Sequence, residues 1–282
     1  MQAAEHWDLE IKPQDNIFNL HLKDVWRYRD LLMLLVRRDF VSFYKQTIFG
    51  PLWFFIQPIF TTIIFTIVFG GLAGISTNEA PKPLFYMAGI TVWNYFSECL
   101  NKTSTVFRDN ANIFGKVYFP RLIMPLSIIL SNLVKFAVQF LLFILMMAYY
   151  LLKGDNVHPN IFILLFPVII FFMAILGLGI GLIVTALTTK YRDLAFLVGF
   201  GVQLLMYASC VIFPMSVSNG KYIHILSLNP LSGLIETFRY SFLGTGEFYP
   251  FAFFYSITIS MFIFFIGLII FNKVEKDFVD TV

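Results

Sequence analysis

The sequence predicts an all-α integral membrane protein, on the evidence of its composition and of the length and continuity of its apolar runs. Of its 282 residues, 58% are hydrophobic and 13% are charged, whereas soluble domains carry about 25% charged residues. So much apolar surface requires lipid as solvent, and in lipid only helices and closed barrels satisfy their backbone groups. The apolar runs are long and continuous, unlike the short alternating segments of a barrel.

Six segments reach the roughly 20 apolar residues that a transmembrane helix requires. Their expected ranges are 48–70, 84–105, 123–152, 161–187, 194–214 and 250–271. Glu98 and Lys102 interrupt the second segment, and their i, i+4 spacing in this order predicts an ion pair between them. Lys135 lies within the third segment, where three roles are open: snorkelling to an interface, pairing with another span, or lining a wet cavity.

The distribution of basic residues predicts the orientation of these spans. With the amino terminus in the cytoplasm, 15 of the 20 Lys and Arg residues fall in inner segments and one, Lys135, falls within a span. The four outer residues are Lys82, Lys153, Lys221 and Arg239. The positive-inside rule therefore favours two cytoplasmic termini and an even number of spans.

Residues 21–36 (HLKDVWRYRDLLMLLV) predict an amphipathic helix ahead of the first span. Its apolar stripe consists of Leu22, Val25, Trp26, Leu32, Met33 and Val36. A helix with such a stripe and a charged opposite face lies in the membrane interface instead of crossing it. An ordinary helix facing solvent is the alternative.

Residues 106–121, between the second and third spans, combine basic charge with the aromatic side chains Phe114, Tyr118 and Phe119. An exposed apolar cluster rimmed by charge is typical of a docking surface. Rings at this position would equally serve as anchors in the lipid headgroup layer. The residues alone leave both interpretations open.

Residues 215–247, between the fifth and sixth spans, are too polar to span a membrane and too apolar for a plain loop. The pair Asn229-Pro230 separates a short apolar piece at 222–228 from a second one at 231–243. We expect two short re-entrant helices in the outer leaflet that pack against protein, because irregular backbone is tolerated there.

The aromatic residues expected in the outer half of the protein include Tyr86, Trp93, Tyr95, Tyr222 and Tyr240. Rings at this depth form interfacial belts, which is the favoured interpretation. The minority interpretation is that they stack on sugar faces along an exit path.

The sequence contains no motif for nucleotide hydrolysis or for other catalysis. A G-x-x-x-x-G-K-[ST] phosphate loop is absent, and the GLGIG run at 177–181 lies inside an apolar segment, where glycines favour close helix packing. The four histidines lack the spacing of metal ligands. We expect no enzyme, no metal site, no cofactor and no nucleic-acid partner for this chain.

Residues 37–58 (RRDFVSFYKQTIFGPLWFFIQP) resemble the start of the first span in ABC-2 type permeases, and more narrowly in exporters of polysaccharide, O-antigen and teichoic acid. Three further stretches resemble the same family: NANIFGKVYFPRLIMPLS at 110–127, TKYRDL at 189–194 and NPLSGLIETFRYSFLG at 229–244. The resemblance makes residues 21–282 one ABC-2 type transmembrane domain, and it leaves residues 1–20 as an N-terminal extension.

The resemblance implies a homodimer in the cytoplasmic (inner) membrane that exports a lipid-linked polysaccharide. Two copies of a separate ABC ATPase would bind the ATP and Mg²⁺, and the helix at 21–36 would act as a gate. The implied substrate entrance consists of Arg37, Arg38, Tyr44, Lys45, Gln46, Trp53 and Gln57. Its basic residues would hold a lipid pyrophosphate, or would instead set topology and bind anionic lipid.

The resemblance also implies contacts with the ATPase through coupling helices at 106–121 and 188–193. The residues concerned are Asn112, Phe114, Lys116, Tyr118, Arg121, Tyr191, Arg192 and Asp193. The re-entrant segment would contain Asn229, Pro230, Glu236 and Arg239. Alternative functions are an ABC-2 exporter of drugs or small lipids, and an ATP-independent flippase or scaffold.

Overall fold

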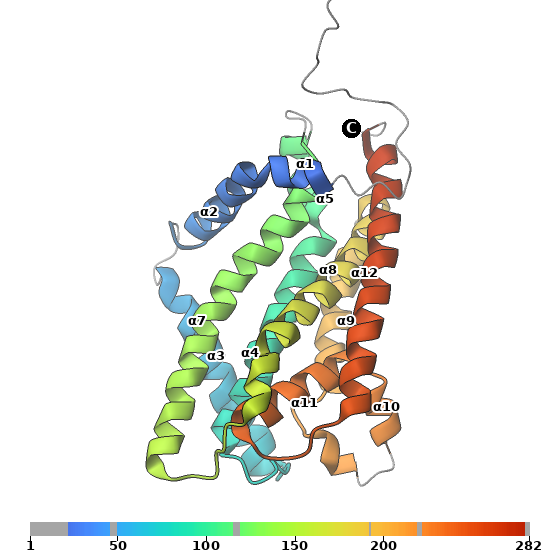
Figure 1. Ribbon diagram of the computed structural model, residues 1–282. Coiled ribbons are helices and arrows are strands. Elements are labelled where there is room, and N and C mark those ends of the chain that lie inside the picture. Colours follow the sequence, from blue (N-terminus) through green and yellow to red (C-terminus); the bar gives the residue numbers. More distant parts are fainter. Residues whose placement is uncertain (1–21, 46–49, 115–118, 192, 219–221, 280–282) are drawn as a thin grey trace, which may run out of the picture.

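The computed structural model describes residues 22–45, 50–114, 119–191, 193–218 and 222–279, and these residues are helical with no strand (Figure 1). The longer helices are α2 (Arg29–Lys45), α3 (Trp53–Phe65), α4 (Lys82–Ser104), α7 (Ile123–Lys153), α8 (Phe166–Lys190), α9 (Leu194–Ala208), α11 (Pro230–Leu243) and α12 (Pro250–Val279). The shorter helices are α1 (Leu22–Arg27), α5 (Val106–Asp109), α6 (Ala111–Phe114) and α10 (Ile223–Ser227). A π-helix, η2 (Thr66–Leu72), extends α3, and short 3-10 turns are η1 (Gly50–Leu52), η3 (Ile161–Leu165) and η4 (Met215–Ser218).

The long helices form a bundle with different caps at its two ends (Figure 1). Helices α1 and α2 lie obliquely across the end that also holds the carboxyl end of α12, whereas α10 and α11 lie at the opposite end. Four candidate spans are long and apolar enough to cross a membrane: Trp53–Leu72, Ile123–Lys153, Ile161–Thr188 and Pro250–Lys273. The chain is therefore a multi-pass membrane protein.

The predicted count of six spans needs two further helices, α4 and α9, and neither is among the four candidate spans. Helix α4 has 23 residues, enough to cross a membrane, but its charged and polar residues keep it out of the apolar set. Helix α9 is apolar but has only 15 residues, a length of about 22 Å at 1.5 Å per residue. The hydrocarbon core of a bilayer is about 30 Å thick.

Two predicted span boundaries are wrong. The first span begins at Trp53 and not at residue 48, because Gly50 has a left-handed backbone (φ 50°) and Pro51 follows it. Both features interrupt an α-helix. The fifth helix ends at Ala208 and not at residue 214, because the backbone of Ser209 is extended.

The core forms around α4, which packs against α8 on one side and α7 on another. The glycines of the GLGIG run explain the closeness of α8, because a Cβ atom on Gly181 would lie 2.6 Å from Thr103 Cβ. On the other face of α8, a Cβ atom on Gly179 would lie 2.8 Å from Phe264 Cα in α12. The prediction that these glycines serve helix packing is confirmed.

The amphipathic N-terminal segment is helical as predicted, but it is longer, and Val25 and Leu32 of its predicted apolar stripe pack on the bundle. A turn at Tyr28 separates α1 from α2, and α2 continues to Lys45. The side that packs on the bundle includes the buried Leu35, whereas Trp26 and Met33 are exposed and face away from the protein. The exposure of Trp26 and Met33 leaves these two residues of the predicted stripe free of the bundle, and the prediction that the helix lies in the membrane interface stays a prediction.

Candidate functional site

On α2, the predicted entrance residue Arg38 is linked to α7 through the carboxylate of its neighbour Asp39. Arg38 forms an ion pair with its neighbour Asp39 at 2.8 Å, and Ser131 of α7 donates a hydrogen bond of 3.5 Å to the same Asp39 carboxylate. Arg37 on the same helix is exposed. The chain thus places Arg38 of the predicted entrance beside α7 through Asp39.

One turn further along α7, Lys135 faces α4. Its Nζ atom lies 3.4 Å from Glu98 Oε2, and Lys102 Nζ lies 3.6 Å from the same oxygen. The predicted pair of Glu98 and Lys102 is confirmed, and of the three roles open to Lys135, pairing with another helix is the one observed. Phe54 of α3 covers this cluster, with its ring centre 6.0 Å from Lys135 Nζ.

We call Arg38, Asp39, Glu98, Lys102 and Lys135 the polar junction. Arg38 and Asp39 pair on α2, and one turn along α7 Lys135 and Lys102 share Glu98, so the five groups of the junction together carry one excess positive charge. Its outer members are open, because the side chains of Glu98 and Lys102 are 47% and 44% exposed. Lysine and arginine groups in such an open position can bind an anionic phosphate group, arginine in a bidentate manner and lysine as a point charge.

The other predicted entrance residues contribute less to this geometry. Lys45, Trp53 and Gln57 are exposed. The side chain of Tyr44 is not described, and Gln46 lies outside the described residues. Sequence reasoning assigned no entrance role to Lys102 or Lys135, although the polarity of the second predicted span was a signal for both.

Those predicted coupling residues that the structure describes lie on short helices and turns near the α1–α2 end of the bundle. Asn112, Tyr191 and Asp193 are exposed, and the guanidinium of Arg121 lies 5.8 Å from the ring centre of Phe107. Lys116, Tyr118 and Arg192 lie outside the described residues, and the side chain of Phe114 is not described either. Phe119, which we expected either on a docking surface or in the lipid headgroup layer, is buried at 4% exposure in the cluster below α2.

The predicted re-entrant segment contains the two expected short helices, α10 and α11. The Asn229 side chain caps α11 by accepting a hydrogen bond from the Leu231 N–H, and Pro230 occupies the first turn. The amide of Asn229 also donates to the carbonyl of Ala208, which ties α11 to the end of α9. Asparagine at the cap and proline in the first turn are the residues that favour such a helix start.

A buried charge cluster, which we call the Arg239 clamp, fixes α11 to the bundle. The Arg239 guanidinium donates hydrogen bonds to the carbonyls of Cys210 and Val211, stacks over the Phe85 ring at 3.7 Å and lies 3.6 Å from Glu236 Oε2. Arg239 is 2% exposed. The sequence counted Arg239 among the cations of the outer segments; the structure buries it at the α10–α11 end, where its partners are the nearby Glu236 and two distant parts of the chain, Phe85 and Cys210–Val211.

The burial of three aromatic residues argues against the predicted exit path. Tyr86, Trp93 and Tyr95 are 0%, 5% and 3% exposed, so no glycan can stack on them in this conformation. Tyr222 is exposed, and Tyr240 packs edge-on against Phe162 with ring centres 5.4 Å apart. Most of these rings fill the core because α4, which carries the first three, lies at its centre.

Comparison with known proteins gives a consistent result. The model of the family described as ABC-2 type transporter matches residues 30–243. The chain is 27% identical over 253 residues to a Klebsiella pneumoniae protein named O-antigen export system permease protein RfbA, covering 89% of this chain and 94% of the relative. A Myxococcus xanthus protein of the same name is 26% identical over 221 residues, 77% of this chain and 82% of the relative. The polysialic acid transport protein KpsM of Escherichia coli is 24% identical over 191 residues, 67% and 72% of the two chains.

Proposed function

Because the chain belongs to the ABC-2 type transporter family, we propose that it is the membrane channel subunit of an ATP-driven exporter of a lipid-linked polysaccharide. The observation that carries this proposal is the similarity along 89% of the chain to a relative named as an O-antigen export permease. The relative named for polysialic acid transport extends the same substrate class to capsule-type polymers.

The proposed assembly is a homodimer in the inner membrane with two copies of a separate ABC ATPase. In each chain α4 and α9 complete a set of six spans, both termini are cytoplasmic, and α10 and α11 are re-entrant. ATP binding in the partner moves the segments at 106–121 and 188–193, and these segments transmit the motion to the spans. The absence of a phosphate loop from the sequence supports a separate source of ATP hydrolysis.

The polar junction is the proposed point at which the substrate's phosphate group enters. Its excess positive charge and the exposure of Lys102 support this role, as does the position of Arg37 and Arg38 on α2 beside it. Movement of α2 relative to α7 would break the contact between Asp39 and Ser131 and widen access from the cytoplasmic leaflet.

Depletion of this protein from cells tests the function directly. We expect lipid-linked glycan to accumulate in the cytoplasmic leaflet while the corresponding glycan disappears from the cell surface. If both pools stay unchanged, the polysaccharide proposal is wrong, and an exporter of drugs or small lipids becomes the leading interpretation.

Charge reversal tests the entrance separately. The variant Arg37→Glu/Arg38→Glu should abolish export while membrane insertion and ATPase binding persist. Arg29→Glu, at an exposed position at the start of α2, is the matched control and should export normally. Normal export by the Arg37/Arg38 variant would exclude their role in holding phosphate.

A further inference from the structure

The carboxyl ends of α4 and α8 are joined by two buried threonine hydroxyls of α8. Thr185 Oγ1 donates a hydrogen bond of 2.5 Å to the carbonyl of Thr103. One turn further along α8, Thr188 Oγ1 donates a hydrogen bond of 2.5 Å to the carbonyl of Ser104. The carbonyls of α8 itself that these hydroxyls reach are farther away, at 2.8 Å and 3.2 Å. Because a hydroxyl has a single proton, the closer carbonyls of α4 are the preferred acceptors.

These two contacts form where α4 needs hydrogen-bond donors. The last carbonyls of an α-helix find no N–H group one turn further along their own helix. Helix α4 ends at Ser104, so the hydroxyls of α8 supply donors to its last two carbonyls. The close approach of the two helices at Gly181 allows side chains as short as threonine to reach across.

Both predicted coupling segments begin at this joint, although 84 residues separate Ser104 from Thr188. The first segment, 106–121, starts with α5, which follows α4 after the single residue Thr105. The second segment, 188–193, starts with Thr188 itself. In addition, α5 packs against α8, and its Phe107 ring stacks on Phe271 of α12 with ring centres 4.9 Å apart. The starts of the two segments are therefore fixed to each other and to the ends of the same helices.

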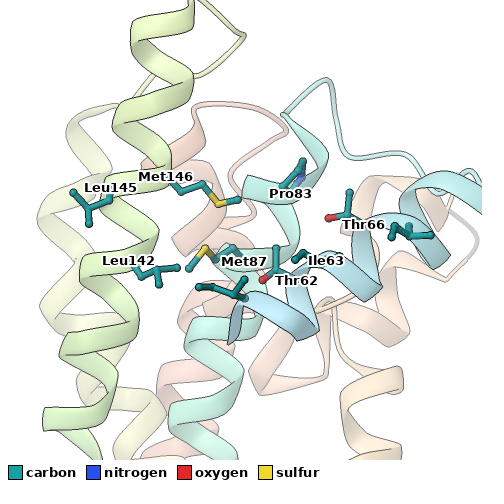
Figure 2. A pocket seen from close by; sticks show the side chains of 10 residues that line it. Thr62, Ile63, Thr66, Pro83, Met87, Leu142, Leu145 and Met146 are labelled. Carbon is teal, nitrogen blue, oxygen red and sulfur yellow. The ribbon is translucent and has the colours of Figure 1, made fainter. Parts of the chain in front are cut away.

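Another face of α4, near its amino end, is held by contacts of a different kind. A groove lined largely by apolar side chains, among them Ile63 of α3, Met87 of α4 and Met146 of α7, lies between these three helices (Figure 2). Hydrophobic contacts have no preferred direction, whereas hydrogen bonds weaken steeply as their angle changes. Displacement of α4 relative to α3 and α7 at this groove is therefore opposed less than displacement relative to the end of α8.

We propose that Thr185 and Thr188 are positioning residues that join the two predicted coupling segments into one rigid unit with the ends of α4 and α8. A displacement of either segment then moves both helices together, so a partner ATPase acts on one body and not on two independent levers. The inference rests on the proposed function for the identity of that partner. The hydroxyl contacts lie within this chain and are testable without it.

Hydrogen–deuterium exchange of the purified protein in nanodiscs tests the joint in the absence of ATPase and substrate. Phe107→Leu weakens the stacking of α5 on α12 and so loosens the first segment. In otherwise wild-type protein, this change should also accelerate exchange about fivefold at Tyr191, whose N–H is hydrogen-bonded to the last turns of α8. In the background Thr185→Val/Thr188→Val, it should accelerate exchange in α5 only.

Thr91→Val is the matched control for the loss of a hydroxyl. Thr91 is buried on α4, and its hydroxyl donates to the Met87 carbonyl of its own helix. In this background, exchange at Tyr191 should respond to Phe107→Leu as in the wild type. A full response in the background with two valines would overturn the proposal, because the segments would then be coupled without the hydroxyls. The absence of a response in the wild type would also overturn it, because the two segments would then open independently.

The complex with the ATPase tests the consequence for transport. Thr185→Val/Thr188→Val should leave complex assembly and ATP hydrolysis in place but lower the glycan exported per ATP about tenfold, the shift expected from losing two hydrogen bonds between membrane helices. Thr185→Ser/Thr188→Ser keeps both hydroxyls and should export normally, and Thr188→Val alone should show an intermediate loss. Normal export per ATP by the double valine variant, or an equal loss in the double serine variant, would overturn the proposal.

The failure of the proposed function is distinguishable from the failure of this inference. If depletion of the protein leaves both glycan pools unchanged while exchange at Tyr191 still depends on the two hydroxyls, the proposed function is wrong and the joint stands. If depletion blocks export while exchange at Tyr191 does not depend on the hydroxyls, the function stands and the joint is wrong.

Discussion

The polar junction and the Arg239 clamp both hold charged groups within the helical bundle, but they differ in how completely those groups are enclosed. At the clamp, the side chains of Arg239 and Glu236 are 2% and 6% exposed. At the junction, the side chains of Glu98 and Lys102 are 47% and 44% exposed. The clamp lies at the α10–α11 end of the bundle, and the junction lies toward the α2 end.

This difference separates a structural charge from one that can bind a ligand. Two carbonyls, one ring and one carboxylate surround the Arg239 guanidinium, so nothing from outside can reach it without unfolding α11. At the junction two lysines share Glu98, and the excess charge faces outward. We therefore expect substitutions at the clamp to alter stability, and substitutions at the junction to alter function with little loss of stability.

The largest effect is expected from Arg239→Met, which leaves the Glu236 carboxylate buried without its cation. Breaking one side of a buried ion pair costs about 3–5 kcal/mol. The variant should lose most of its folded, monodisperse protein in detergent, measured by size-exclusion chromatography and thermal unfolding. A variant as stable as the wild type would mean that the clamp does not hold α11 in place.

A double substitution sharpens this result, because it separates the cost of a lone charge from the cost of lost packing. Arg239→Met/Glu236→Gln removes both charges and should recover more than half of the stability lost in Arg239→Met. Replacing both members of a buried pair is often nearly neutral. If the double variant is as unstable as the single one, the hydrogen bonds to Cys210 and Val211 outweigh the ion pair.

The next effect in size is expected at Gly89 of α4, which faces the clamp. A Cβ atom there would lie 2.4 Å from Arg239 Nη2 and 2.9 Å from the Val211 carbonyl oxygen. Gly89→Ala should therefore displace the guanidinium and cost about 1–3 kcal/mol in thermal unfolding. Gly201→Ala on α9 is the control, because a Cβ atom there meets nothing within 4 Å. Equal unfolding temperatures for the two variants would contradict the close fit.

Sequence patterns predicted helices whose ends are set by neighbouring residues, and they failed to predict contacts between residues that are distant in the chain. Helix α7 was expected at 123–152 and is observed at Ile123–Lys153, because its long apolar run and the Gly154 that follows define both ends. The extension of α2 to Lys45 could have been predicted, since the chain from 37 to 45 contains neither glycine nor proline. The burial of Arg239 could not, because hydropathy does not reveal contacts with Phe85 or Cys210.

A smaller effect is expected for Lys135→Met at the junction. Polar contacts between membrane helices contribute about 0.6 kcal/mol on average and reach about 1.7 kcal/mol. Because Glu98 keeps Lys102 as a partner, the cost should fall within this range in thermal unfolding. A loss as large as that of Arg239→Met would show that the junction is enclosed like the clamp.

The smallest single effect is expected for Lys102→Gln, because an exposed ion pair contributes about 0.2–1 kcal/mol. The informative measurement is the double-mutant cycle with Lys135→Met. Since both lysines bind the same Glu98 oxygen, each single variant leaves that carboxylate one cation, and only the double variant leaves it with none. The double variant should therefore lose more stability than the two single variants together, by about 0.5 kcal/mol or more. Simple additivity would mean that the lysines act independently and that Glu98 is not shared.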